Sequence, residues 1–299
     1  MDQMTSEIMR PDLKVVLVAT DFSARSDRAI RRAAAIAREA RARLVLAHVV
    51  DDDQPEHHVA AECDLAETAL ADAIRQHTYL AGLQCSPLVV CGTAFSGIVQ
   101  AAEQQEADLC VIGSHRRAFL KDIFVGTTAE RVIRNSSVPV LMANIDPALR
   151  YASCLAPVDL SDCSLQALRT GQRLGVLANI RMVILHVYDA AAVGMLSYAG
   201  VDKGNVDDYL ADARVEAVRE LMRFLKPLDL DNVDYSTMVR EGVAQTAIVD
   251  VAAELRPDLV VIGTHGRRGA VRLLLGSVTE EVLRRLNRDI LIVPSRDAV

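Results

Sequence analysis

Short apolar runs alternate with longer amphipathic stretches along the whole chain. The runs are rich in Val, Ile, Leu and Ala and almost continuously apolar, which is typical of parallel strands covered on both faces. Between the runs, apolar residues recur at helical spacing. In residues 24–42, for example, alanines and isoleucines mark one face and arginines the other. This alternation predicts an α/β fold of the doubly wound type, a mainly parallel sheet with helices on both faces.

The pattern predicts a similar set of elements in each half of the chain. The expected strands cover residues 14–19, 43–49, 86–91, 108–112 and 138–143, and residues 153–158, 180–187, 234–240, 258–262 and 289–293. The expected helices cover residues 24–42, 59–80, 95–105 and 127–135, and residues 162–176, 206–226, 245–255 and 277–286. A polar loop over residues 51–58 is expected before the second helix.

The two halves also repeat one another residue by residue. Gly113 and Gly263 lie 150 positions apart, whereas Asp21 and Asp159 lie 138 apart, so the second half carries about twelve extra residues. We expect these in residues 190–205, as a mobile loop. A repeat of this length predicts two homologous five-stranded domains, residues 1–146 and 151–299, with a linker near Asp146–Arg150.

Composition narrows the function classes. The net charge of −7 argues against a general nucleic-acid or anionic-membrane binder. No run of about eighteen apolar residues is present, so no membrane span is expected, and residues 1–13 lack the apolar core of a signal peptide. The six cysteines form no Cys-x-x-Cys pair and are interpreted as reduced thiols, not as a disulfide framework or zinc site. Together these features predict a cytoplasmic globular protein without a metal site of its own.

A glycine-punctuated loop carries the strongest chemical signal. Gly263, Gly266 and Gly276-Ser277 follow the apolar run 258–262 and precede a predicted helix. Glycine lets the backbone approach an anion closely, and the free N–H groups of a helix's first turn favour negative charge. The loop is therefore predicted to bind phosphate. In the first half the second glycine is replaced by Arg116.

The spacing Gly-x2-Gly-x9-Gly-Ser/Thr resembles the ATP-binding signature of the universal stress protein family, and nearly the whole chain resembles two such domains in tandem. The resemblance implies an ATP site, or an AMP or ADP site, in the second domain, and it allows Mg²⁺ to accompany the phosphates. The residues implied are Pro157, Asp159, Val187, Gly263, His265, Gly266, Arg267, Gly276, Ser277 and Val278. A degenerate second site is implied at Asp21, Val49, Gly113, Arg116, Gly126 and Thr127.

Several of these residues also have a simpler interpretation. Ser277 and Thr127 each have Glu three positions later, which is a capping box. Asp159 either contacts adenine and ribose or caps the following helix. Val187 and Val49 either offer backbone groups beside adenine or only pack at strand ends.

The loop residues leave alternatives open as well. His265 either donates to phosphate or is solvated. Arg116 either weakens nucleotide binding in the first domain or pairs with a phosphate.

The family resemblance and the absent motifs together suggest a function. No Gly-x4-Gly-Lys-Ser/Thr loop, no Gly-x-Gly-x-x-Gly after the first strand and no Gly-x-Ser-x-Gly elbow is present. Because no paired carboxylates are placed to activate water, at most weak ATP hydrolysis is expected. The favoured hypothesis is a nucleotide-dependent stress regulator or adaptor with an unknown protein partner. A slow ATPase or nucleotide-dependent transferase, and a nucleotide-independent scaffold or ligand carrier working through the first domain, remain alternatives.

The resemblance also implies how the two domains meet. Domains of this family dimerise through their last strands, so residues 138–143 and 290–294 are expected to pair within one chain as a pseudo-dimer. A further homodimer of two chains stays open.

Overall fold

The computed structural model describes residues 12–113, 127–146, 150–189, 203–230, 233–265 and 275–295. The strands of the first half are β1 (Val15–Ala19), β2 (Arg43–Val50), β3 (Cys85–Cys91), β4 (Leu109–Gly113) and β5 (Val140–Ala143). Those of the second half are β6 (Ser153–Val158), β7 (Arg181–Tyr188), β8 (Tyr235–Glu241), β9 (Leu259–Gly263) and β10 (Asp289–Val293).

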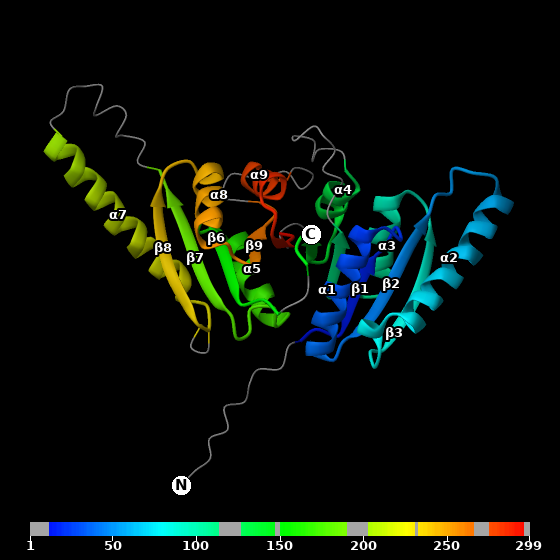
Figure 1. The fold of residues 1–299 in the computed structure, drawn as a ribbon. Coiled ribbons are helices and arrows are strands. Elements are labelled where there is room, and N and C mark those ends of the chain that lie inside the picture. The colour runs from blue at the N-terminus through cyan, green and yellow to red at the C-terminus, as the bar shows by residue number, and fades with distance from the viewer. Residues whose placement is uncertain are drawn as a thin grey trace, which may run out of the picture.

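Helices separate these strands in both halves (Figure 1). The first half contains α1 (Ala24–Ala40), α2 (Glu56–Gln76), a 3₁₀ turn (Thr78–Leu80), α3 (Ala94–Gln104) and α4 (Thr128–Asn135). The second half contains α5 (Asp162–Arg173), α7 (Lys203–Leu225), α8 (Ala244–Leu255) and α9 (Ser277–Arg285). The predicted α/β alternation is therefore confirmed.

The strands described form one continuous sheet in the order β3-β2-β1-β4-β5-β10-β9-β6-β7-β8. Every neighbouring pair is parallel except β5 and β10, which run antiparallel with Leu141 opposite Leu291. The two five-stranded sheets thus join edge to edge through their last strands (Figure 1). This is the pairing expected from residues 138–143 and 290–294, and it covers two sheet edges that would otherwise stay open.

Helices from both halves cover each face of the sheet. Alternate strand residues point to opposite faces, so Val16 and Val18 pack with α1, whereas Leu17 packs on the other side. One core lies under α1, α2, α5 and α7, and the other lies under α3, α4, α8 and α9. Since each core contains residues of both repeats, burial of apolar surface links the halves on both faces.

The observed boundaries correct two predictions. The predicted loop 51–58 and helix 59–80 are wrong at their ends, because α2 begins at Glu56 after Pro55 and stops at Gln76. Pro55 is compatible with a helix start, and the positive end of the helix dipole stabilises the carboxylate of Glu56 in the first turn. The predicted helix 162–176 ends early, at Arg173, and Gly175 follows with φ of 73°. The predicted insertion at 190–205 lies largely outside the described residues.

Candidate functional site

The strand order reverses between β6 and β9, and the two strands separate there. Their pairing is limited to Cys154 opposite Leu259 and Leu155 opposite Val260, whereas β9 stays paired with β10 as far as Gly263. Pro157 has no N–H to donate to a neighbouring strand. Doubly wound folds bind ligands at the carboxyl ends of the strands where the order reverses, so this edge is the candidate site.

Asp159 follows β6 and is held by two serines. Its Oδ1 accepts hydrogen bonds from the hydroxyls of Ser161, at 2.5 Å, and Ser164, at 2.7 Å, and from the backbone N–H of Ser161 at 3.1 Å. The N-cap of α5 is Ser161, so the alternative of Asp159 as helix cap is wrong. The intervening Leu160 adopts a left-handed φ of 64°. The half-buried carboxylate is therefore fixed at the end of β6.

The same loop occurs at the end of β1. Asp21-x-Ser23-x-x-Ser26 matches Asp159-x-Ser161-x-x-Ser164, and Phe22 is left-handed like Leu160, with φ of 59°. These serines are not among the predicted site residues, although their repetition at both strand ends is a signal that could have identified them. A left-handed non-glycine residue costs roughly 1 kcal/mol, so its presence in both repeats shows that the surrounding loop determines this turn.

Gly263 is required by close packing on α5. A Cβ atom there would lie 2.5 Å from Sγ of Cys163 and 3.2 Å from its carbonyl oxygen. Gly113 occupies the matching place, where a Cβ atom would lie 3.1 Å from the carbonyl oxygen of Arg25. These two glycines therefore let the start of a helix contact the end of a strand, which is a structural role beside any contact with an anion.

Gly276 is brought back to the end of β9. Its N–H donates to the carbonyl oxygen of Thr264 at 2.8 Å, and the hydroxyl of Thr279 donates to the carbonyl oxygen of Gly263, also at 2.8 Å. His265 stands beside these groups, with its Nδ1 2.9 Å from Oγ1 of Thr264. The two ends of the glycine loop are thus joined, and α9 starts at the carboxyl end of β9.

The start of α9 differs from the sequence prediction. Ser277 is the first helical residue and Gly276 is the N-cap, with no side-chain hydrogen bond to the helix N–H groups. The predicted capping box at Ser277 is therefore wrong. Ser277 lies one residue after the N-cap position, inside the helix, and its hydroxyl does not accept a hydrogen bond from the first helical N–H groups. The exposed Ser277 hydroxyl instead accepts a hydrogen bond from Gln245 on α8 at 3.3 Å. Val278 packs its side chain on the core, so its backbone N–H is the group it can offer.

In the first domain, a side chain caps the equivalent helix start. Thr127 is the N-cap of α4, and its hydroxyl accepts from the N–H of Glu130 at 3.2 Å, which confirms the predicted cap. Asp21 also has a cationic neighbour, since a guanidinium nitrogen of Arg25 lies 3.8 Å from its Oδ2. Cys163 occupies the position of Arg25 in the second domain.

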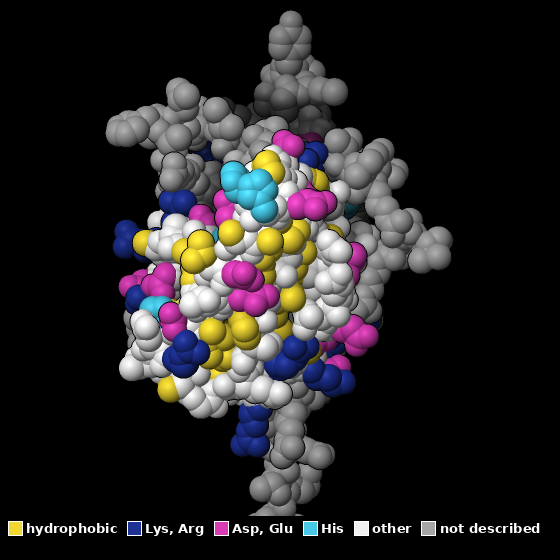
Figure 2. Space-filling view, turned by 90° about the vertical axis from the view of Figure 1, so that its right-hand side faces the viewer, with side chains coloured by type: hydrophobic (Ala, Val, Ile, Leu, Met, Phe, Trp, Pro, Cys, Tyr) yellow, Lys and Arg dark blue, Asp and Glu magenta, His cyan; other side chains and the backbone are white. Residues whose placement is uncertain are grey.

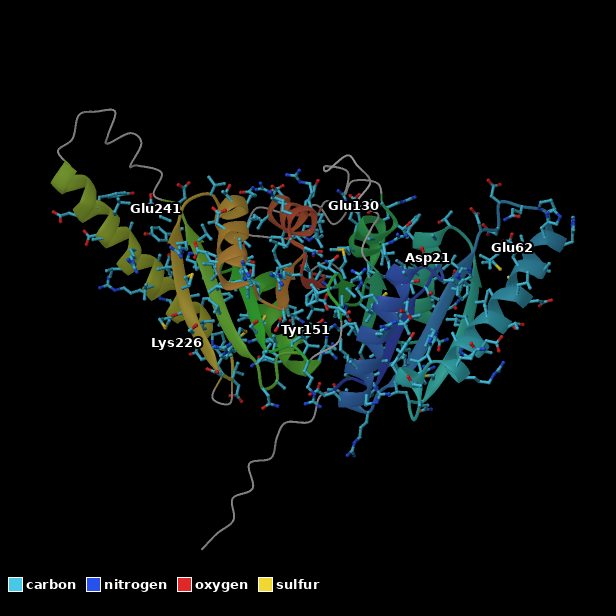
Figure 3. All side chains as sticks on the ribbon, viewed as in Figure 1. Asp21, Glu62, Glu130, Tyr151, Lys226 and Glu241 are labelled. Carbon is cyan, nitrogen blue, oxygen red and sulfur yellow. The ribbon has the colours of Figure 1, made fainter. Side chains whose placement is uncertain are left out.

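The electrostatics of Asp21 follow from these contacts. Partial burial raises the pKa of its carboxyl, but hydrogen bonds from Ser23 and Ser26 and the charge of Arg25 outweigh burial, so the net pKa is lowered. The carboxylate of the first domain therefore already has its own cation. The labelled Asp21 and Glu130 lie on the upper edge of the first domain in Figure 3.

The ends of β2 and β7 also lie at the carboxyl edge of the sheet. Val187 and Val49 are half-buried and pack on the core. Their side chains therefore have the strand-end packing role, and only the backbone remains for a ligand. The ring Nδ1 of His186 donates to the carbonyl oxygen of Val158 at 3.0 Å, and that of His48 donates to Thr20 at 2.8 Å. The histidines thus link neighbouring strand ends, which is a structural role.

Gly92 and Gly242 directly follow β3 and β8, with φ of 139° and 133°. Side-chain-bearing residues rarely adopt this conformation, so these two glycines are required by the backbone. Their N–H groups donate to the carbonyl oxygens of Val50 and Tyr188.

Gly266, Arg267, Arg116 and Gly126 lie outside the described residues. Within the described ranges, no group of three or more His, Cys, Asp or Glu side chains could hold a metal ion, and none of the helices is long and apolar enough to cross a membrane. A cavity of about 870 Å³ lies at the opposite edge of the sheet, near the amino ends of β6 and β7, and Glu39, Arg150 and Tyr151 are among the residues that line it. It is separate from the candidate site.

Comparison with known proteins gives the same family for both halves. The family model described as the universal stress protein family matches residues 13–144 and again residues 150–294. A universal stress protein of Mycobacterium tuberculosis is 25% identical over 282 residues, which cover 90% of this chain and 92% of the relative. One from Methanocaldococcus jannaschii is 25% identical over 162 residues, covering 50% of this chain and 99% of the relative.

The fold agrees with a solved structure over nearly the whole chain. The crystal structure of a universal stress protein from Archaeoglobus fulgidus superposes with a TM-score of 0.70 at 19% identity and covers 97% of this chain and 99% of its own. At that identity the match shows the fold, and the two family matches along the chain show the ancestry. The chain therefore belongs to the universal stress protein family and carries two domains of that family in tandem.

Proposed function

We propose that the second domain binds an adenine nucleotide, ATP or alternatively AMP or ADP, at the carboxyl edge between Asp159 and Ser277. We further propose that the bound nucleotide makes the chain a regulator or adaptor in a cytoplasmic stress response. Family membership, the complete Gly-x2-Gly-x9-Gly-Ser spacing and the reversal of strand order at this edge support the proposal.

The observation that carries the proposal is the start of α9. The first N–H groups of a helix have no partners inside the helix, and a side-chain cap normally satisfies one of them. α9 has no such cap, and Ser277 keeps its hydroxyl exposed. A phosphate group fits this place, because it accepts from several N–H groups and a hydroxyl at once and is favoured by the helix dipole.

Asp159 supports the other end of the ligand. A carboxylate can accept hydrogen bonds from ribose hydroxyls or from the exocyclic amine of adenine. The hydrogen bonds from Ser161 and Ser164 hold the Asp159 carboxylate in one position before any ligand arrives. A preorganised acceptor of this kind binds at a lower entropic cost than one on a free side chain.

The first domain is proposed to bind nucleotide more weakly, so that one chain carries one nucleotide. Thr127 already uses its hydroxyl as the cap of α4, Asp21 already has Arg25 beside it, and Arg116 replaces the second glycine. In this proposal Mg²⁺ accompanies the phosphates as their counter-ion. An unidentified protein partner would then recognise the nucleotide-bound second domain.

The test begins with the nucleotide that the purified chain already carries. The protein is denatured, and the released nucleotide is identified by mass spectrometry and counted per chain. About one nucleotide per chain is expected. Two per chain would contradict the asymmetry between the domains, and no released nucleotide together with no binding of a fluorescent ATP analogue would overturn the proposal.

Matched variants then locate the site. Ser277→Ala should weaken binding of the fluorescent analogue by about tenfold or more, since a hydrogen bond to a charged group contributes about 1.5–3 kcal/mol. Thr127→Ala, the equivalent change in the first domain, should leave that affinity unchanged. Gly266→Arg, which introduces the residue of the first domain, should also weaken binding. Equal affinity in Ser277→Ala and wild type would place the phosphates elsewhere.

A further inference from the structure

Two cysteines far apart in the sequence meet at the outer end of the first domain. Sγ of Cys63, on α2, lies 3.4 Å from Sγ of Cys91, the last residue of β3. The labelled Glu62, which precedes Cys63, marks this place on α2 in Figure 3. The sulfur atoms are in van der Waals contact, so a small side-chain rotation would bring them to bonding distance.

This pair differs from the other cysteines of the chain, all of which are described. Cys110 and Cys154 are buried in the sheet, and Cys85 and Cys163 are half-buried; within the described residues, only Cys63 and Cys91 share a sulfur–sulfur hydrogen bond. Cys91 is exposed and Cys63 is half-exposed. Figure 2 shows the end of the molecule formed by α2 and β3, where hydrophobic side chains are interspersed with acidic and basic ones. Small reagents in solvent can therefore reach Cys91.

The surroundings give the two sulfurs different roles. Burial raises the pKa of the Cys63 thiol to about 11, and its contact with Cys91 and the charges of Asp64 and Glu67 act in the same direction. Either sulfur can donate to the other across this contact. The exposed Cys91 is the sulfur that a reagent meets first.

We propose that Cys63 and Cys91 form a reversible disulfide when the protein meets a peroxide. The thiolate of Cys91 attacks one peroxide oxygen, the O–O bond breaks, and the departing oxygen leaves as water after taking up a proton. The Cys63 thiol then gives up its proton, and its thiolate attacks the sulfur of the sulfenic acid formed on Cys91. The S–O bond breaks, the Cys63 proton goes to the leaving hydroxyl, and a second water departs. With hydrogen peroxide, two thiols and one peroxide yield one disulfide and two waters.

The bond would tie α2 to the edge of the sheet. The described side chains of α2 that are fully buried are Ala66 and Leu70, so few apolar contacts hold this helix. Cys91 lies opposite Val50 at the end of β2, so the bond would form at the carboxyl edge of the sheet. The second domain has Glu241 at the position of Cys91, labelled in Figure 3, so the switch belongs to the first domain alone. This site is independent of the proposed nucleotide site.

The test uses the full chain, treated with hydrogen peroxide in the absence of metal and thiols. Intact mass should fall by two hydrogen atoms, and non-reducing peptide mapping should show the peptide of Cys63 linked to that of Cys91. Dithiothreitol should restore both thiols. The oxidised chain should also show slower amide exchange in α2 and a higher Tm than the reduced chain, because the bond closes a loop across 28 positions.

Two variants provide the comparison. Cys63→Ser should abolish the cross-link and leave Cys91 oxidised to a sulfinic acid, whereas Cys85→Ser, a control in the neighbouring part of β3, should cross-link like wild type. Sulfinic acid on Cys91 of the wild-type chain without a cross-linked peptide would overturn the proposal, and so would two unmodified thiols after treatment. Mapping of the wild-type chain keeps the test valid even if a variant fails to fold.

Discussion

The guanidinium of Arg32 on α1 lies 2.7 Å from the carboxylate of Asp289 on β10, measured from Nε to Oδ2, and this buried ion pair joins the two domains. The residues are 2% and 0% exposed. Asp289 also accepts hydrogen bonds from the backbone N–H groups of Asn144 and Ile145 and from the hydroxyl of Tyr151. One carboxylate therefore holds α1, the end of the first domain and the start of the second.

The ion pair breaks the symmetry between the repeats. The positions equivalent to Arg32 and Asp289 are occupied by Thr170 and Pro139, which cannot form it. The paired strands β5 and β10 are nearly alike, but this contact needs one domain of each kind. It therefore favours pairing of the first domain with the second over pairing of two identical domains.

Removing Asp289 should destabilise the whole chain. In Asp289→Ala the Arg32 charge stays buried without this partner, and three hydrogen-bond donors lose their acceptor, so the free energy of unfolding should fall by about 3–5 kcal/mol. Denaturant unfolding followed by circular dichroism measures this loss. Arg219→Ala, which removes an exposed ion pair with Glu216, is the control and should change stability by no more than about 0.5 kcal/mol. Equal losses in the two variants would show that the buried pair does not hold the domains together.

Stability should decline at alkaline pH, partly because of Tyr151. Burial, followed by the charge of Asp289, raises the pKa of its hydroxyl well above the ordinary value of 10.0. The folded state therefore keeps the proton while the unfolded chain loses it, so the contribution of Tyr151 is present below about pH 10 and is lost as the pH rises further. Tyr151→Phe should flatten the decline of Tm above pH 10, measured by thermal unfolding at a series of pH values.

Tyr79 should add to the same slope, since burial and its hydrogen bond to Asp27 also raise its pKa. The decline of Tm above pH 10 should be smaller in the double variant, with both Tyr151 and Tyr79 changed to Phe, than in either single variant. An unchanged slope in the double variant would mean that other groups cause the alkaline decline.

The packing role of Gly263 can be tested apart from ligand binding. Gly263→Ala should cost about 1–3 kcal/mol of stability even without nucleotide, because the new methyl group would overlap Sγ of Cys163. Adding Cys163→Ala removes that sulfur and should recover part of the loss, while the contact with the carbonyl oxygen remains. Denaturant unfolding of the nucleotide-free variants measures both effects. A fully stable Gly263→Ala would show that the glycine serves the ligand alone.

Loss of a hydroxyl should destabilise the chain at the start of α4 but not at the start of α9. Thr127→Ala removes the cap of α4 and should cost about 1 kcal/mol of stability. Ser277→Ala removes no cap and should change the stability of the nucleotide-free chain by less than about 0.5 kcal/mol. Parallel denaturant titrations make the comparison. A larger loss in Ser277→Ala would indicate that this hydroxyl supports α9 after all.

Much of the fold could be predicted because local patterns carry it. The apolar runs are nearly continuous, so the positions of β6 and β9 were predicted within a residue. The ends of α2 were less predictable, because polar residues such as Glu56 fit a first helical turn as well as a loop. Capping depends on where a helix starts, and one residue of difference separates the roles of Thr127 and Ser277.

The two repeats, the alternation of strands and helices and the spacing of the glycine loop follow from the amino-acid sequence alone, because each depends on neighbouring positions or on a constant offset. Contacts between distant residues, in contrast, become known only from the folded chain. Gly263 against Cys163, Arg32 against Asp289 and Cys63 against Cys91 each join different elements. Such contacts depend on how helices pack on the sheet and how β5 meets β10, and periodicity along one chain contains no information on either.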